Sequence, residues 1–124
     1  MLEKVSTDLI QECKKRLLRQ KQDLLNRLKT SHFEMSAHDK MAGDEADQCV
    51  AQLAENSFLA NFERIRFQLL EIESALGRIE NGQFGVCEET SEPIEANRLL
   101  AIPYTRLSIE GAEIREAVAQ RYAR

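Results

Sequence analysis

The feature that most constrains the fold of this chain is a regular stripe of apolar residues in its second half. Successive members lie alternately four and three residues apart, which is the a/d register of a coiled coil held for about three heptads. A helix with such a stripe needs a partner, because the stripe would otherwise face water. Asn81-Gly82 is a strong signal for the end of this helix. The stripe consists of Phe58, Phe62, Ile65, Leu69, Ile72, Leu76 and Ile79.

The partner helix is predicted in the first quarter of the chain, from about Thr7 to His32. The polar residues from Thr30 to Gly43 interrupt its pattern, and we interpret them as the turn between two arms. Asp44 then begins the second helix. Two such helices fold back as an antiparallel coiled-coil hairpin, and about 35 residues at ~1.5 Å each make a rod of roughly 50 Å. The apolar positions of the first arm are Ile10, Cys13, Leu17, Leu24 and Leu28.

The last third of the chain has a different character. Between Gln83 and Thr105, short apolar pieces alternate with polar turns, which is typical of a compact knuckle with two short strands. A last helix is predicted from Ser108, a suitable cap, to Tyr122. We expect its apolar side chains to face the base of the rod: Ile109, Ala112, Ile114, Val118, Ala119 and Tyr122. The predicted fold is mainly α, with a hairpin over residues 1–82, its tip at about 33–47, and a small globular base over residues 83–124.

Composition narrows the class of protein. A hydrophobic share of 43% and a charged share of 31% suit one small soluble helical domain. The net charge is −4, whereas a free nucleic-acid binder normally carries a basic excess, so DNA is not expected as a direct partner. Because no apolar run has the length of a signal peptide or a membrane span, we expect a protein of the cytoplasm. We also expect it to be a monomer. There the three cysteines would be reduced thiols.

Two groups of charged residues on the second helix have a simple structural interpretation. Asp44 and Asp47 lie where that helix begins, and aspartates there satisfy free N–H groups and complement the helix dipole. Cys49 follows two residues later. Arg64 lies outside the apolar stripe, where a solvated charge is ordinary. From the residues alone, neither group indicates a function.

Three segments taken together resemble the DksA/TraR family of bacterial RNA polymerase regulators. They are the Asp-x-x-Asp pair at 44 and 47, RIENGQFGVCE at 78–88 and IPYTRLSIEGAEIRE at 102–116. The family carries two CxxC pairs that bind zinc, and the matching positions here are Cys87, Thr90, Ser108 and Gly111. Because a zinc site needs four ligands, the resemblance implies a zinc-independent, cysteine-poor member without a cofactor. Apolar side chains would then hold the knuckle: Phe84, Val86, Ile94, Leu99 and Ile102.

The resemblance also implies a function and a partner. In this family the rod enters the secondary channel of RNA polymerase, and the tip aspartates, here Asp44 and Asp47, approach the active centre. Promoter open complexes change in stability, and ribosomal RNA promoters are repressed as in the stringent response. Cys49 replaces a family alanine at the tip, and Arg64 coincides with a family arginine that contacts the polymerase. A member of this family is a regulator and not an enzyme.

One family feature is missing from the sequence. Well-studied members bind ppGpp with a basic cradle, but the matching positions here are Glu71, Ile102 and Ala112, and none of them is basic. Arg98 matches a family arginine that we interpret as structural. Synergy with ppGpp is therefore not expected through this site.

Two other classes of function stay open at this point. The first is a factor that stimulates transcript cleavage, as Gre factors do with a similar hairpin, in which the tip carboxylates help to hold a catalytic metal in the polymerase. The second is a coiled-coil adaptor without chemistry at its tip. A redox role of Cys49 is a further alternative, because a helix N-terminus can lower the pKa of a thiol.

Overall fold

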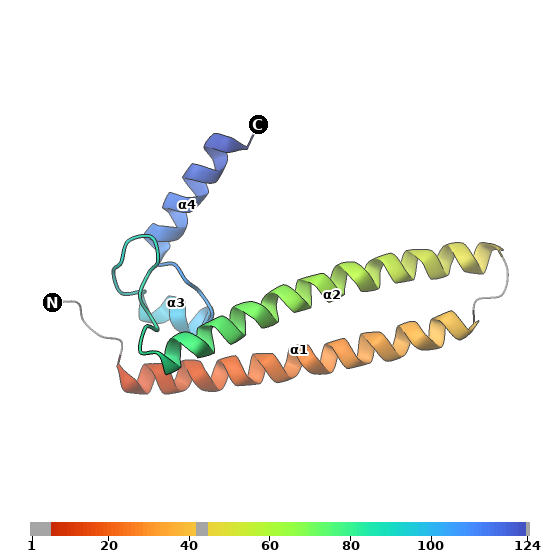
Figure 1. The fold of residues 1–124 in the computed structure, drawn as a ribbon, viewed down its shortest axis with the longest axis horizontal. Coiled ribbons are helices and arrows are strands. Elements are labelled where there is room, and N and C mark those ends of the chain that lie inside the picture. Colours follow the sequence, from red (N-terminus) through yellow and green to blue (C-terminus); the bar gives the residue numbers. More distant parts are fainter. Residues whose placement is uncertain (1–5, 42–44, 124) are drawn as a thin grey trace. The chain divides into compact units, whose positions relative to one another are not determined.

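The computed structural model of the chain describes residues 6–41 and 45–123, and it is mainly helical (Figure 1). Its helices are α1 (Thr7–Met41), α2 (Glu45–Glu80), α3 (Ala96–Ala101) and α4 (Ile109–Tyr122). The predicted fold class is confirmed: α1 and α2 pair as a coiled-coil hairpin, and a small base follows. None of the described helices is long and apolar enough to cross a membrane.

The chain divides into two compact units. The first, which we call the base unit, consists of Met1–Arg19 and Glu71–Arg124, and the second, the hairpin unit, of Gln20–Leu70. The base unit therefore takes in the beginning of α1 and the end of α2 as well as the knuckle. The division after residue 82 that the sequence suggested stays a prediction.

The core of the base unit forms where the first turns of α1 meet the knuckle. Cys13 and Leu17 of α1 have no exposed surface, and neither does Leu99 of α3. The sulfhydryl of Cys13 donates a hydrogen bond to the Leu99 carbonyl at 3.6 Å, which confirms Cys13 as a core residue. Leu9, Ile10 and Ile79 are among the partly buried residues around it. Burial of each large apolar side chain contributes about 1.5–3 kcal/mol. The buried members of this cluster are Cys13, Phe84, Cys87, Ile94 and Leu99.

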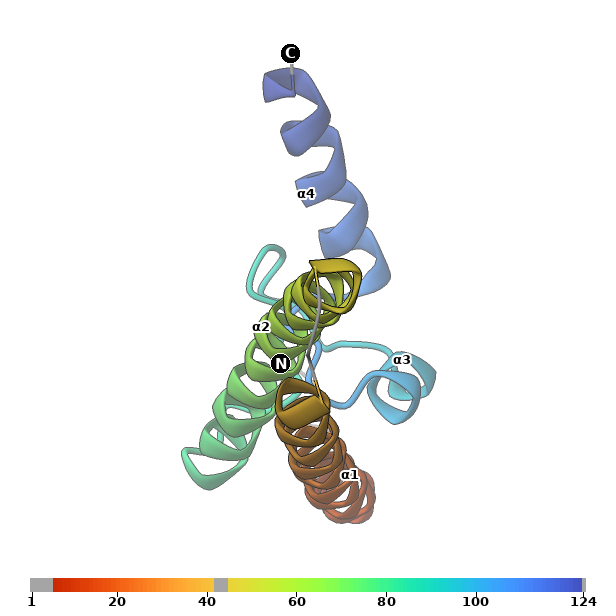
Figure 2. The same ribbon diagram turned by 90° about the vertical axis from the view of Figure 1, so that its right-hand side faces the viewer.

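In both units the apolar stripe of α2 lies where the sequence predicts. All seven stripe positions are buried or half-buried, while neighbours such as Arg66 and Phe67 are exposed. In the hairpin unit the ring of His32 on α1 lies 6.3 Å from the ring of Phe58 on α2, measured between centroids. Figure 2, which looks along the two helices, shows α1 and α2 side by side.

The turn predicted for Thr30 to Gly43 is wrong over most of its length. Helix α1 continues through Met41. The segment SHFEMSAHDKM is polar, but it contains neither glycine nor proline, and Glu, Met, Ala and Lys are good helix formers. The polar residues of this segment interrupt the apolar stripe of α1, but the helix itself continues. Residues 42–44, and with them Asp44, lie outside the described residues.

The end of α2 follows the prediction from Asn81-Gly82. Gln83 N–H donates to the Arg78 carbonyl at 2.9 Å, and Gly82 N–H donates to the Ile79 carbonyl at 3.3 Å. This is a Schellman motif, and it needs a left-handed residue at Gly82, whose φ is 73°. The motif turns the chain sharply into the knuckle.

Three expectations for the base are wrong. The described part of the knuckle contains no strand pair, only a single bridge between Val86 and Pro93, followed by α3. Val86 is 44% exposed and does not join the core, whereas Cys87 and Pro103 are fully buried. Only the beginning of α4 packs, because the helix leaves the base after its first turn. Ala112 is half-buried, but the large apolar side chains of α4 are exposed, with Ile114 at 38%, Val118 at 45% and Tyr122 at 84%.

Candidate functional site

The four positions that match zinc ligands come together in the base unit. Cys87 opens a tight turn in which Ser91 N–H donates to the Cys87 carbonyl at 2.9 Å, and Cys87 N–H donates to the Glu92 carbonyl at 2.8 Å. Ser91 has a φ of 60°, the left-handed conformation that closes the turn. Ser108 caps α4, as predicted, and its side-chain oxygen accepts from Gly111 N–H at 3.0 Å. The knuckle turn thus faces the N-terminus of α4.

The sulfur of Cys87 lies at the centre of this arrangement. Ser108 Oγ donates to Cys87 Sγ at 3.4 Å, and both residues are buried. Burial raises the pKa of the Cys87 thiol, but hydrogen bonds from the side chains and backbones of Ser108 and Thr90 outweigh burial and lower this pKa to about 6. Hydrogen bonds to the charged form stabilise it in this way. The hydroxyl groups around Cys87 thus favour the thiolate form of its sulfur.

Gly111 leaves the space that the sulfur needs. A Cβ built at Gly111 would collide with Cys87 Sγ and would lie 3.3 Å from Cβ of Glu89. Any side chain at this position would therefore displace the sulfur or the turn that carries it. Glycine is required here by close approach and not by backbone conformation.

Zinc does not fit these residues. A tetrahedral site needs four thiolate, imidazole or carboxylate ligands, but one thiolate, two hydroxyls and a glycine occupy the positions. The sulfur also fills the space next to Gly111. In the part of the chain that the structure describes, no group of three or more His, Cys, Asp or Glu residues is arranged to hold a metal.

Two arginines attach the segment before α4 to helix α2. Arg106 Nε and Nη2 donate to both oxygens of Glu71, at 3.1 and 3.3 Å, and Nη2 also donates to Ser74 Oγ at 2.8 Å. Arg78 Nη1 donates to the same hydroxyl oxygen at 3.0 Å, and its Nη2 donates to the Tyr104 carbonyl at 3.3 Å. Burial and the neighbouring Arg106 charge lower the pKa of Arg78. Glu71 and Glu88 supply the carboxylates that face these two guanidinium groups.

Further ion pairs and hydrogen bonds tie α4 to the knuckle. Arg115 Nε donates to Glu89 Oε2 at 3.0 Å, and its Nη2 lies 3.4 Å from Glu88 Oε2. The Glu95 carboxylate accepts from Ile109 N–H at 3.0 Å. Arg98 Nε donates to the Leu107 carbonyl at 2.8 Å, in agreement with the structural role predicted for it. These contacts fix the first turns of α4 only.

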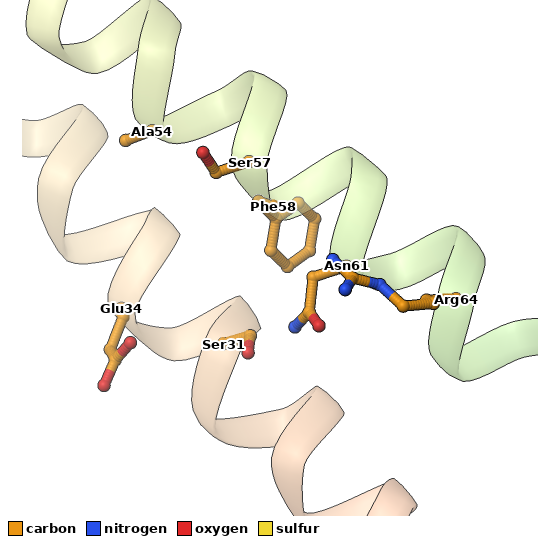
Figure 3. A pocket seen from close by; sticks show the side chains of 7 residues that line it. All are labelled: Ser31, Glu34, Ala54, Ser57, Phe58, Asn61 and Arg64. Atoms are coloured by element: carbon orange, nitrogen blue, oxygen red, sulfur yellow. The ribbon is translucent and has the colours of Figure 1, made fainter.

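The residues predicted at the tip belong to the hairpin unit. Asp47 is the third residue of α2, and Asp47 and Cys49 are both exposed. Asp44 lies outside the described residues. Arg64 is exposed and lines a groove between α1 and α2 (Figure 3), and it forms no hydrogen bond or ion pair in the described part of the chain. The sequence predictions for Asp47, Cys49 and Arg64 as contact residues stay predictions.

Sequence reasoning missed Arg78 and Arg106. Arg78 belongs to the RIENGQFGVCE segment and Arg106 to the IPYTRLSIEGAEIRE segment, and both segments carry the resemblance to the DksA/TraR family. Neither segment shows which residues these arginines contact. Glu71 and Arg106 are 35 positions apart, so nothing local in the sequence could have paired them. No sequence signal marks this pairing, because both arginines lie in segments that also contain several glutamates.

Comparison with known proteins now identifies the class. Residues 82–117 match the family described as "Prokaryotic dksA/traR C4-type zinc finger". The RNA polymerase-binding transcription factor DksA of Caulobacter vibrioides is 32% identical over 103 residues, 83% of this chain and 72% of that protein. The uncharacterized protein YteA of Bacillus subtilis is 32% identical over 112 residues, 80% of this chain and 46% of that protein.

A solved structure agrees with these sequence relationships. The transcription factor DksA2 from Pseudomonas aeruginosa superposes with a TM-score of 0.84 and 32% sequence identity, covering 93% of this chain and 88% of that chain. A coiled-coil hairpin with a zinc-finger-like base defines a DksA-type protein. This chain belongs to the DksA/TraR family.

Proposed function

We propose that this chain is a transcription regulator that binds RNA polymerase. The observation that carries the proposal is its identity of 32% over 103 residues with a factor named for RNA polymerase binding. The match to a DksA2 structure over 93% of the chain supports the same assignment. The net charge of −4 supports action through protein contacts rather than through DNA. We further propose that it acts as a monomer in the cytoplasm and catalyses no reaction of its own.

The proposed mode of action uses the hairpin. It enters the secondary channel, Asp44 and Asp47 approach the active centre, and the stability of promoter open complexes changes. Ribosomal RNA promoters are repressed as a result. The exposure of Asp47 and Cys49 supports this proposal, because side chains there are accessible to a partner. The exposed guanidinium of Arg64 supports a contact with the polymerase.

The protein works without zinc in this proposal. The support is the hydrogen-bonded Cys87, the missing ligands and the absence of space at Gly111. Elemental analysis of the purified protein should find no stoichiometric metal, and helicity should persist in chelator. About one zinc per chain, with helicity lost on chelation, would contradict the zinc-free knuckle.

The function is tested by capture of RNA polymerase from solution, followed by transcription in vitro from a ribosomal RNA promoter. We expect a stable complex and repression. A complex that instead stimulates cleavage of stalled transcripts would assign the tip carboxylates to a Gre-like function. A complex that changes neither reaction would leave only an adaptor role.

A further inference from the structure

Burial in the hairpin unit is confined to one layer. Among its described side chains only Leu24, 7% exposed, and Ile65, 4% exposed, are buried. The base unit, by contrast, buries Leu17 and Ile72 almost completely on the same two helices. Because packed apolar side chains supply most of the stability of paired helices, the two ends of the hairpin differ in what holds them together.

The residues beyond this layer explain the difference. We call residues 29–34 of α1 and 47–61 of α2 the distal segment. Its inward positions carry Ser31 on α1 and Ala54 and Asn61 on α2, which are small or polar and only half-buried. Phe58 is the one large apolar side chain of the stripe in this segment, and it too is half-buried. A seam built from such residues gains little from the contact between its helices.

The groove between α1 and α2 forms a solvent-open cavity within this seam. It has a volume of about 540 Å³, and Figure 3 shows side chains of both helices around it. Side chains that face an open groove do not pack against one another and lose the dispersion contacts that close packing provides. Its lining residues are Ser31, Glu34, Ala54, Ser57, Phe58, Asn61 and Arg64.

Large apolar side chains of the distal segment do not fill the gap. Phe33 is 75% exposed, Val50 54% and Leu53 67%. They lie on faces of the helices that turn away from the seam, so their apolar surface contributes nothing to pairing. The distal segment thus combines an under-packed seam with exposed apolar surface.

We propose that the distal segment opens locally, with α1 and α2 separating there, while the layer at Leu24 and Ile65 and the base unit stay folded. The opening is a property of the chain alone and goes beyond the proposed function. A partner that binds only the closed form must shift the equilibrium between open and closed forms. Its apparent affinity is then the intrinsic affinity multiplied by the fraction of closed molecules. That consequence for the polymerase rests on the proposed function.

Hydrogen–deuterium exchange of the full chain tests the opening. We expect backbone amides of residues 50–61 to exchange at least ~10-fold faster than those of residues 65–79, at a rate independent of global unfolding. Equal protection of the two stretches of α2 would overturn the proposal.

A cavity-filling substitution separates opening at the cavity from ordinary fraying of a helix end. Ala54→Leu places a larger side chain in the cavity, whereas Ala60→Leu makes the same change at an exposed position of the same helix. We expect only Ala54→Leu to slow exchange of residues 50–61, by ~3-fold or more, and to leave residues 65–79 unchanged. Ser31→Leu fills the cavity from α1 and serves if Ala54→Leu folds poorly. Equal effects of Ala54→Leu and Ala60→Leu would overturn the role of the cavity.

The affinity of the same variants for RNA polymerase is measured in a separate experiment. Ala54→Leu should bind RNA polymerase more tightly than Ala60→Leu, by the ratio of their closed fractions, which cannot exceed the factor by which it slows exchange. Slower exchange without tighter binding would overturn the link between opening and affinity. Failure of the unmodified protein to bind the polymerase would overturn the proposed function, while the exchange rates would still decide the opening.

Discussion

Arg106 donates two hydrogen bonds to the carboxylate of Glu71, from Nε to Oε2 at 3.1 Å and from Nη2 to Oε1 at 3.3 Å. These hydrogen bonds, with a third from Nη1 to Glu88, raise the pKa of Arg106. The guanidinium is therefore charged at every pH at which the protein is folded. The pair links the segment before α4 to α2, so we expect it to stabilise the base unit.

A double-mutant cycle measures this pair. Arg106→Gln and Glu71→Gln, alone and together, should give a coupling of about 1 kcal/mol in the free energy of unfolding, since two-point pairs at half-buried positions exceed ordinary surface pairs. The Arg16–Glu12 pair, whose side chains are 42% and 47% exposed, is the matched control and should give about 0.3–0.5 kcal/mol. Urea denaturation at low and high salt supplies the values. Equal couplings in the two cycles would argue against a special role for Arg106.

The same pair bears on the response to ppGpp. At the positions of the family's basic cradle the chain has Glu71, Ile102 and Ala112. The guanidinium of Arg106 beside Glu71 already donates hydrogen bonds to the carboxylates of Glu71 and Glu88. We expect ppGpp to add less to the activity of this protein than to that of a zinc-bearing relative. Transcription in vitro with a polymerase that lacks its own ppGpp site is the measurement. Strong synergy would mean that other residues form the cradle.

A feature of this fold could be predicted from the sequence where a repeating or local pattern of residues produces it. The α2 stripe and the Gly82 stop were predictable because an a/d repeat and a left-handed glycine are local signals. The length of α1 was not, because the polar run after Thr30 removes the stripe but contains no helix breaker. The exposure of Ile114 and Val118 could not be predicted either, since an apolar helix face carries no information about whether a partner is present in the same chain.

The candidate site divides in the same way. The sequence identified the positions that meet in the base, from Cys87 to Gly111, because their spacing matches a family pattern. It could not predict that the Cys87 sulfur fills the space beside Gly111 or that Ser108 donates to it, since both depend on how the knuckle turn meets α4.

Gly111→Ala should destabilise the base unit by about 1–3 kcal/mol, because the new Cβ would collide with the Cys87 sulfur. Gly77→Ala is the matched control. Nothing lies within 4 Å of a Cβ built at Gly77, which is inside α2, so this change should stabilise the protein by about 0.5–1 kcal/mol. Chemical denaturation of both variants gives the comparison. A Gly111→Ala protein as stable as the original would show that the sulfur has room to move.

The lowered pKa of Cys87 predicts a pH dependence of stability. Its value of about 6 in the folded protein lies below the ordinary value of 9.0, so the folded state favours the thiolate. This contribution is fully present above pH 9 and is lost progressively as the pH falls towards 6. Cys13 acts in the opposite direction. Because burial raises its pKa above 9.0, it lowers the free energy of unfolding as the pH rises through 9.0, at the upper limit of this range.

Urea denaturation between pH 6 and 9 checks this dependence. The free energy of unfolding should fall with decreasing pH in the unmodified protein, and the slope should be much smaller in Cys87→Ser, which cannot ionise in this range. The slope is the readout, so a uniform loss of stability in Cys87→Ser does not affect the comparison. A slope that Cys87→Ser leaves unchanged would assign the dependence to other groups.

Asp47 is the third residue of α2 and is exposed. Asp47→Asn should abolish or sharply reduce regulation of a ribosomal RNA promoter while leaving polymerase binding and folding nearly intact. The substitution keeps the shape of the side chain and removes its charge. Loss of a favourable interaction with the helix N-terminus costs at most about 1 kcal/mol, and the exposed position makes a packing defect impossible. A stability change of that size cannot account for a complete loss of regulation.

Asp8→Asn is the matched control, because Asp8 lies in the first turn of α1 and is also exposed. Both variants should melt within a few degrees of the original protein, since a loss of about 1 kcal/mol shifts the melting temperature of a domain of this size by only a few degrees. Thermal melting, polymerase affinity and promoter repression are measured on the same preparation. If repression survives in Asp47→Asn, the carboxylate serves only the helix terminus. If the variant unfolds while Asp8→Asn does not, the residue is structural. Loss of repression with binding and melting unchanged in both variants locates the regulatory activity in the Asp47 carboxylate.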